Sequence, residues 1–289
     1  MAEANKISRL LHVLPESERF PVDIKKIAIE ISSVRYKDAP ITRFETFDID
    51  GVDGLLGRHP SGRKWKIGHN SQIRSPGRIR FTQAHEFGHY ILHRELRERF
   101  LCSTKDMHEW DEKSIEAEAD VFASFLLMPL DDYRNQIAGQ APSIDLLRHC
   151  SSRYGVSMMA AALKWTEIAP KRSVVLAARD GFVLWARSNN AAFRSKAYLA
   201  SRKHTIPVPE ASVLNRASTN EPITSLIRAN AWFPSEPADV ELVEHALAVE
   251  GDFPYTLAIL VLPESTPQWG DAEDELLAPV NHVVRRVQR

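Results

Sequence analysis

Residues 80–93 read Arg80-Phe81-Thr82-Gln83-Ala84-His85-Glu86-Phe87-Gly88-His89-Tyr90-Ile91-Leu92-His93. His85 and His89 are four residues apart, and on a helix such residues lie on one face. Two imidazoles on one face can hold a single metal ion, and Glu86, beside the first histidine, can then reach a water molecule on that ion. The stretch therefore predicts a helix that carries part of a metal site.

A motif this short also arises by chance, so its surroundings must support the helix. Small and apolar residues recur at spacings of three and four, which is typical of a helix with one buried face; they are Phe81, Ala84, Gly88, Ile91 and Leu92. Thr82 is a candidate N-terminal cap. Gly88 costs about 1 kcal/mol of helix stability relative to alanine, and we expect its missing side chain to let another segment approach closely.

A second informative segment, residues 115–129, has helical spacing throughout and ends at Pro129. A catalytic zinc site needs three protein ligands and one open position. Glu116 and Asp120 are four residues apart and share a face beside an apolar stripe. We therefore predict Glu116 as the third ligand and Asp120 as a hydrogen-bond acceptor for the outer nitrogen of a ligand histidine. Glu112 and Glu118 are alternatives to Glu116, and an acidic, solvated first turn of a core helix is the non-functional interpretation.

Together the two segments resemble the ImmA/IrrE family of metallopeptidases. The resemblance rests on Arg80-Phe81-Thr82 leading into the stretch from His85 to His93, and on the pattern Glu116-x-x-Ala119-Asp120-x-Phe122-Ala123-x-x-Leu126-Leu127-Met128-Pro129. It implies a gluzincin-like helical core with a small sheet, His85, His89 and Glu116 as zinc ligands, and Glu86 as the catalytic base. It also implies an intracellular regulator that cuts repressors or antitoxin-like DNA-binding proteins in a stress or mobile-element response. Manganese fits the same donors.

The metzincin arrangement of zinc ligands does not fit this chain. It requires a glycine three residues and a histidine six residues after the second histidine, where this sequence has Leu92 and Glu95. His93 continues the histidine stripe, but three successive turns of one helix do not converge on one tetrahedral ion, so we interpret His93 as a packing or hydrogen-bonding residue. A donor for the transition-state oxyanion is not fixed by the sequence; candidates by residue type are His69, Tyr90, His93 and Tyr133.

Residues 63–69 alternate polar and apolar side chains, as a half-buried strand does. We consider it an edge strand that holds an extended substrate, or one whose basic residues protect the edge from aggregation. Cys102 lies between the two metal-site segments. It can approach the metal as a redox-sensitive inhibitor, although a buried, inert thiol is the interpretation that we favour here.

Length favours two domains rather than one, and composition is that of an ordinary globular protein. The chain has 37 Lys and Arg against 38 Asp and Glu, which argues against a surface built to attract nucleic acid. Two cysteines do not suggest a disulfide framework. The first residues lack an apolar signal core and no run is long enough to span a bilayer, so we expect a cytoplasmic protein without membrane contact.

The predicted fold class is α+β, in three parts. Residues 1–136 form the metallopeptidase domain. Residues 137–169 read as helix, turn and helix, with Gly155 in the turn and Ser157 capping the second helix. DNA readers show similar spacing, but this segment has little net positive charge, so we expect intramolecular packing rather than DNA contact.

Residues 170–289 are predicted as a separate α+β domain with a sensor-like or substrate-recruiting role. It begins with a hairpin over 173–186 that turns at Asp180-Gly181, and residues 255–262 form an apolar strand. Residues 239–250 and 271–287 are predicted helices, and 188–222 a long loop. Three aromatic residues fit core filling better than a ligand pocket; they are Trp232, Phe253 and Trp269.

The pattern as a whole predicts a zinc-dependent endopeptidase that hydrolyses a protein substrate. The alternative is a DNA-binding or partner-binding regulator whose metal site is structural. A structural zinc site is closed by four protein ligands, whereas a catalytic one has three and an open position. A pseudo-enzyme is a further class, and the intact His85, Glu86 and His89 argue against it.

Overall fold

The computed structural model describes residues 1–102, 110–250 and 254–264, and for residues 110–113 the backbone alone. Contacts between residues divide the chain into two compact units. The first comprises Met1–Asn135 with Ser151–Ser157, and the second comprises Gln136–Cys150 with Met158–Arg289. The predicted α+β class is confirmed, since both helices and two sheets are present. The predicted limits of independently folding domains stay a prediction.

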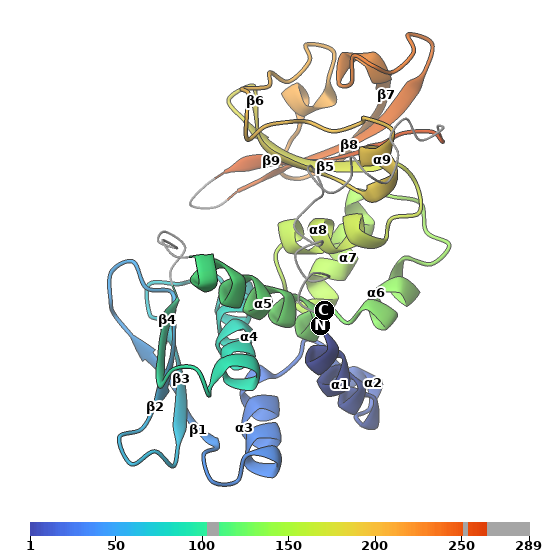
Figure 1. Ribbon diagram of the computed structural model, residues 1–289. Coiled ribbons are helices and arrows are strands. Elements are labelled where there is room, and N and C mark those ends of the chain that lie inside the picture. Colours follow the sequence, from blue (N-terminus) through green and yellow to red (C-terminus); the bar gives the residue numbers. More distant parts are fainter. Residues whose placement is uncertain (103–109, 251–253, 265–289) are drawn as a thin grey trace. The chain divides into compact units, whose positions relative to one another are not determined.

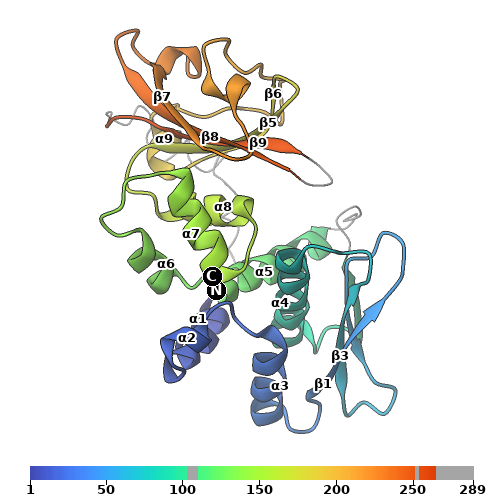
Figure 2. The same cartoon turned by 180° about the vertical axis from the view of Figure 1, so that it is seen from behind.

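The first unit consists of a four-stranded sheet and the helices around it (Figure 1). Its strands are β1 (Ile41–Phe47), β2 (Gly54–Arg58), β3 (Trp65–Asn70) and β4 (Arg99–Cys102). Its longest helices are α3 (Ile24–Arg35), α4 (Pro76–His93) and α5 (Trp110–Leu127). Shorter ones are α1 (Ala2–Leu10), a 3-10 turn (Leu11–Val13) and α2 (Glu16–Arg19). The sheet packs against α4, and α5 lies beside α4 on the side away from the sheet (Figure 2).

The order of strands in this sheet is β1-β3-β2-β4. β3 pairs in parallel with β1 and antiparallel with β2. The prediction that residues 63–69 form an edge strand is therefore wrong. The alternation of polar and apolar residues arises because Trp65 and Ile67 face the core while Lys66 faces solvent. A central strand with one covered face shows the same alternation, so the pattern does not identify an edge. Within the described residues, β4 is the edge strand beside β2.

Helix α4 begins earlier than predicted. Ser75 is its N-cap and accepts a hydrogen bond from Arg78 N, and Pro76 occupies the first helical position. Proline is favoured there because the first helical amide has no partner inside the helix and the fixed φ suits a helix. The prediction of Thr82 as the cap is wrong, because Thr82 is buried inside the helix.

Helices α4 and α5 pack closely at Gly88. A Cβ atom on Gly88 would lie 3.0 Å from Cδ1 of Phe122 and 3.3 Å from the backbone of Ala119. The expectation that Gly88 allows a close approach is confirmed. This contact brings the face of α5 that carries Glu116 and Asp120 beside the histidines of α4.

Three helices follow α5, and the chain bends sharply between the last two. They are α6 (Leu130–Ile137), α7 (Ile144–Tyr154) and α8 (Met158–Ile168). Gly155 has a φ of +59°, so the turn between α7 and α8 uses a left-handed conformation that glycine adopts without strain. The predicted sequence of helix, turn and helix is confirmed.

The second unit contains a five-stranded antiparallel sheet of order β6-β5-β9-β8-β7. The strands are β5 (Ser173–Arg179), β6 (Phe182–Ser188), β7 (Ile223–Arg228), β8 (Glu241–Val249) and β9 (Tyr255–Val261). Asp180 and Gly181 have positive φ angles between β5 and β6, which is the turn predicted for this hairpin. The apolar strand predicted over 255–262 is confirmed as β9.

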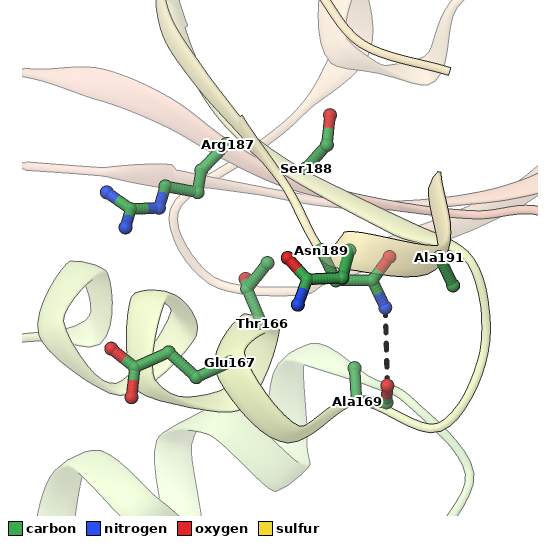
Figure 3. Close-up of a pocket in the computed structure, with 8 residues that line it drawn as sticks. Thr166, Glu167, Ala169, Arg187, Ser188, Asn189 and Ala191 are labelled. Atoms are coloured by element: carbon green, nitrogen blue, oxygen red, sulfur yellow. Dashed lines mark hydrogen bonds between the residues drawn. The ribbon is translucent and has the colours of Figure 1, made fainter. Parts of the chain in front are cut away.

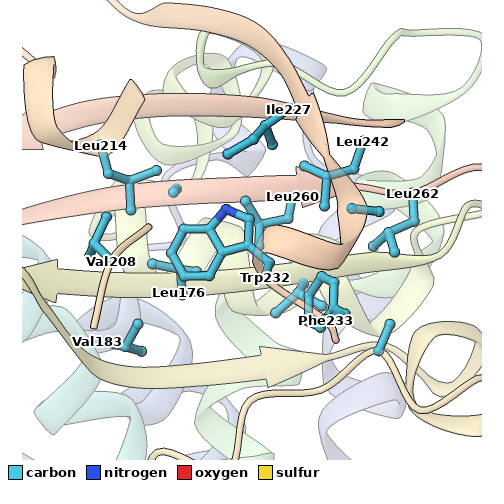
Figure 4. Packing of buried hydrophobic residues seen from close by; sticks show 14 of the residues in the cluster. Leu176, Val183, Val208, Leu214, Ile227, Trp232, Phe233, Leu242, Leu260 and Leu262 are labelled. Atoms are coloured by element: carbon cyan, nitrogen blue, oxygen red, sulfur yellow. The ribbon is translucent and has the colours of Figure 1, made fainter. Parts of the chain in front are cut away.

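One face of this sheet is covered by an apolar core centred on Trp232 (Figure 4). Short segments contribute to this core: α9 (Asn190–Arg194) and the 3-10 turns Val213–Arg216 and Ala229–Ala231. Trp232 is 4% exposed, so it fills the core as predicted. Phe253 and Trp269 lie outside the described residues.

The prediction of a helix over 239–250 is wrong, because these residues form β8. Leu242, Glu244 and Ala246 are buried on one face of the strand. The buried charge on Glu244 interrupts the apolar alternation that marks a strand. The core tolerates this carboxylate because Ser212, the Val213 amide and the Trp232 indole all donate to it.

The predicted loop 188–222 is mostly irregular, apart from α9 and the turn Val213–Arg216. The helix predicted over 271–287 lies outside the described residues. Among the described residues, the helices are too short or too polar to cross a lipid bilayer.

Candidate metal centre

Three predicted ligands converge between α4 and α5. The Nε2 atoms of His85 and His89 are 3.0 Å apart. Glu116 reaches both rings, with Oε2 3.0 Å from Nε2 of His85 and Oε1 3.3 Å from Nε2 of His89. Both imidazole rings thus direct their Nε2 atom toward the carboxylate of Glu116.

These separations fit a small divalent ion. With bonds of about 2.0–2.1 Å, the donors of a tetrahedral zinc ion stand about 3.3–3.4 Å apart. The three nitrogen–nitrogen and nitrogen–oxygen separations, 3.0 to 3.3 Å, are close to this value. Donor atoms of His85, His89, Cys102 and Glu116 all lie within 4.8 Å of one another. The cluster can therefore hold a metal ion, and its donor types suit zinc.

Glu86 is fully buried next to this cluster. Neither of its carboxylate oxygens has a hydrogen-bond partner among the described residues. A buried carboxylate without a partner is costly, so such a group usually marks a functional position. Its space depends on Gly54 of β2, where a Cβ atom would overlap Oε1 of Glu86 and approach Cγ2 of Thr82 to 2.8 Å.

The outer nitrogens of both histidines also have partners. Nδ1 of His85 lies 2.9 Å from Oδ1 of Asp120. Nδ1 of His89 lies 3.1 Å from Nδ1 of His93, whose Nε2 is 3.1 Å from Glu118. Asp120 therefore orients the ring of His85 directly, and Glu118 orients the ring of His89 through His93. Such partners fix the tautomer that leaves Nε2 free for a metal.

The roles of His93 and Glu118 were only partly predictable. His93 is buried and hydrogen-bonded, as expected. Glu118 was considered only as an alternative ligand, although its reach to His93 places it in the chain of hydrogen bonds. In the sequence, the signal for these hydrogen bonds was a histidine four residues after His89. The side chain of Glu112 lies outside the described residues.

The acidic neighbours of His85 favour the protonated form of its ring. Burial acts to lower the pKa of His85, but hydrogen bonds with Asp120 and Glu116 outweigh it and raise the pKa to about 10. Burial acts to raise the pKa of Glu116, whereas hydrogen bonds from both histidines bring it down to about 2. Burial lowers the pKa of His89. A metal ion would take the place of the proton on His85, since ligand histidines bind metal in their neutral form.

Burial raises the pKa of Glu86 to about 8. A carboxylate with a pKa near the working pH can both accept and return a proton, which is what a general base at this position requires. Burial is the largest cause of this shift, and sequence spacing does not show it.

Cys102 is buried at the end of β4 and completes the cluster. Its Sγ lies 3.8 Å from Oε1 of Glu116. Burial raises the pKa of the thiol above its usual range. Cys102 is buried, as the favoured interpretation expected. Its sulfur also lies among the metal donors, which that interpretation did not include.

Of the candidate oxyanion donors, three have other contacts. Tyr90 donates its hydroxyl to the Ala39 carbonyl. His93 contacts His89 and Glu118. Tyr133 stacks on Tyr154 with ring centroids 5.3 Å apart. His69 of β3 is half-buried, opposite Gly54 in the sheet, and its Nδ1 is 3.4 Å from Nε2 of Gln83.

The second unit has a pocket of its own, of about 240 Å³ (Figure 3). Its lining includes Arg187 and Glu167, whose opposite charges interact. The amide of Asn189 donates to the carbonyls of Ala169 and Lys171, so the fold itself uses this group. None of the histidine cluster lines this pocket.

Comparison with known proteins finds a similar family domain. Residues 39–166 match the model of the IrrE N-terminal-like domain of the M78 peptidase family. This part of the chain is similar to that family's domain. The IrrE-like domain, as we call residues 39–166, contains every residue of the cluster. It includes both metal-site helices and the whole four-stranded sheet.

A solved structure of a Mycobacterium tuberculosis transcriptional regulator resembles the chain beyond the IrrE-like domain. The TM-score is 0.54 at 12% sequence identity, over 91% of this chain and 77% of the other. This likeness shows the fold. No curated protein matches the sequence.

Proposed function

We propose that this protein is a zinc-dependent endopeptidase that cuts a repressor or antitoxin-like DNA-binding regulator. One observation carries the proposal. Three donors suited to zinc, on His85, His89 and Glu116, converge beside the buried and unpartnered carboxylate of Glu86. The similarity of residues 39–166 to a domain of the M78 peptidase family supports the same chemistry.

His85, His89 and Glu116 would hold the ion. A bound zinc ion acts as a Lewis acid and lowers the pKa of water to about 7. Glu86 takes the proton from the attacking water, because its carboxylate has no competing hydrogen bond. It then returns that proton to the leaving amine. Asp120 and the Glu118–His93 pair hold the two imidazoles in place during these steps.

We assign His69 as the donor for the oxyanion. Its hydrogen-bonding groups are less committed than those of the other candidates, and β3 places it opposite Gly54, the residue that contacts Glu86. Burial lowers the pKa of His69, so its ring is neutral at physiological pH and a neutral ring still has one N–H to donate.

The substrate would bind as an additional strand along β4. This strand has one neighbour within the described sheet, and it ends at Cys102 in the cluster. Backbone hydrogen bonds to an edge strand hold a peptide in extended form, largely independently of its sequence. Leu101 is 49% exposed on this strand and offers an apolar contact to the substrate.

One observation favours the second candidate function, in which a structural metal site supports a DNA-binding or partner-binding regulator. Cys102 supplies a fourth donor atom to the cluster. Four protein ligands are typical of structural zinc sites. This alternative predicts a bound metal without proteolysis.

The experiment is to incubate the zinc-loaded protein with any DNA-binding regulator that is encoded next to its gene, and to identify products by mass spectrometry. Cleavage at one peptide bond is expected, and it should disappear with chelator and with Glu86→Gln. Glu95→Gln is the matched control, because Glu95 is on the surface and its side chain is 84% exposed. An intact regulator with zinc bound would support the structural alternative.

Two further parts of the proposal concern the setting. The protein acts in the cytoplasm, where its substrate would be, and manganese can replace zinc in the same donor set.

The segment from α7 to α8 packs within the protein rather than reading DNA. Binding of labelled duplex DNA at low salt, with and without Arg148→Ala, tests the last point.

A further inference from the structure

We propose that Cys102 is the fourth protein donor to the metal ion in the resting protein, and that its sulfur closes the position that a substrate needs. The second half of this inference rests on the proposed peptidase function. The first half concerns coordination alone and stands without it.

The distances around the sulfur fit coordination. With a zinc–sulfur bond of about 2.3 Å and a zinc–oxygen bond of about 2.0–2.2 Å, tetrahedral neighbours stand about 3.6 Å apart. Sγ of Cys102 lies 3.8 Å from Oε1 of Glu116. All four donor atoms lie within 4.8 Å of one another, so a small movement of side chains brings the sulfur to an ion held by the other three.

The fold holds Cys102 in this place from two sides. It pairs with Gly54 in the ladder between β2 and β4, and its carbonyl accepts a hydrogen bond from Asp53 N. Phe100, two residues earlier on the same face of β4, stacks on His89 with ring centroids 4.7 Å apart. The inward face of β4 therefore packs directly on the metal site.

A second, independent observation points to the same position. Both carboxylate oxygens of Glu86 are buried and unpartnered, and Gly54 leaves the room that they occupy. Because Cys102 pairs with Gly54, the sulfur's strand and the buried carboxylate lie at the same side of the cluster.

The step balances with solvent as the proton acceptor. On closing, the S–H bond of Cys102 breaks, a bond forms between the sulfur and the cation, and the proton passes to water. On opening, the sulfur leaves the cation and takes a proton back from water. The closed state blocks the site because the sulfur fills the open position.

Coordination can be measured without any substrate. In the wild-type protein loaded with cobalt in place of zinc, we expect a thiolate-to-cobalt charge-transfer absorption in the near ultraviolet. Cys102→Ser should lose this band, whereas Cys150→Ser should keep it. Cys150 is a suitable control because it is the second of two cysteines in the chain, is also buried, and is outside the cluster.

X-ray absorption at the zinc edge of the wild-type protein provides a test that needs no variant. One sulfur neighbour is expected beside nitrogen and oxygen. A shell of nitrogen and oxygen alone, or a cobalt band that survives Cys102→Ser, would overturn the assignment of Cys102 as a donor.

The closing role is tested separately, by the rate at which the regulator is cut. Cys102→Ser should cut it several-fold faster than Cys150→Ser, because a serine hydroxyl is a weaker ligand than a thiolate. Equal rates would refute closure. Absence of cleavage by every variant, with the sulfur signal present, would refute the proposed peptidase function while the donor assignment holds.

Discussion

Gly54 and Glu86 are in direct contact across the interface between β2 and α4, and the glycine has no side chain because the carboxylate occupies that space. A Cβ atom at Gly54 would overlap Oε1 of Glu86 and crowd Thr82. The sheet thus shapes the position of the predicted base, although the two residues are far apart in the sequence.

Gly54→Ala is therefore expected to displace the Glu86 carboxylate and leave the metal ligands in place. Small misplacements of a catalytic group lower rates by about 10²-fold, so we expect a loss of this order in the rate of cleavage with zinc content unchanged. Gly57→Ala is the control on the same strand, since a Cβ there meets only side-chain atoms at 3.4 to 3.9 Å. Equal activity of the two variants would contradict this role of Gly54.

Asp120→Asn should weaken metal binding without removing a ligand. The carboxylate of Asp120 lies 2.9 Å from Nδ1 of His85 and strengthens that ring as a donor. Loss of such a partner lowers metal affinity by about 10–100-fold, which competition with a chelating dye measures. Asp131→Asn is the control, because Asp131 is 58% exposed and outside the cluster. An unchanged zinc affinity would show that His85 does not need Asp120.

Gly88→Ala should loosen the packing of α4 on α5. Alanine gains about 1 kcal/mol of helix propensity, but overpacking costs about 1–3 kcal/mol. The backbone of Ala119, 3.3 Å from the new Cβ, cannot move away without shifting the helix that carries Glu116. We expect a lower unfolding midpoint in urea and weaker zinc binding. A variant as stable as the wild type, with the same zinc affinity, would mean that the helices adjust freely.

The ion pair of Asp132 with Arg153 should make stability depend on pH. Asp132 accepts two hydrogen bonds of 2.8 Å from Arg153 and one of 2.6 Å from the Tyr154 hydroxyl. Burial acts to raise the pKa of Asp132, but these hydrogen bonds outweigh it and lower the pKa below its ordinary value. A carboxyl group whose pKa is lowered by folding stabilises the protein above its unfolded pKa, about 3.9, and this stability is lost as the pH falls through the folded value.

Asp132→Asn is accordingly expected to lower the free energy of unfolding by about 1.5–3 kcal/mol at pH 7. The difference from the wild type should shrink as the pH falls below about 4. Urea unfolding at several pH values measures it. Asp145→Asn provides the comparison, because its pair with Arg148 is exposed and such pairs contribute about 0–1 kcal/mol. If the free energy of unfolding of Asp132→Asn differed from that of the wild type by the same amount down to acid pH, the result would contradict the ionic interaction.

Local spacing determined the core of the metal site. His85 and His89 share a face because a helix repeats every 3.6 residues, and the same periodicity places Glu116 with Asp120. The hairpin at Asp180-Gly181 was predictable for a similar reason, since two adjacent residues set the turn. Each of these features depends on residues that are near in sequence.

The tertiary structure decided everything that depends on pairing between distant segments. Strand order made β3 central and β4 an edge, and no local pattern encodes which neighbour a strand takes. The core around Trp232 accepted Glu244 because three donors surround that carboxylate, so a segment with a helical pattern became β8. Cys102 lies among the metal donors because β4 pairs with β2 at Gly54. Helical periodicity is a property of one segment, whereas the contacts of a strand are made with residues that the chain brings to it only on folding.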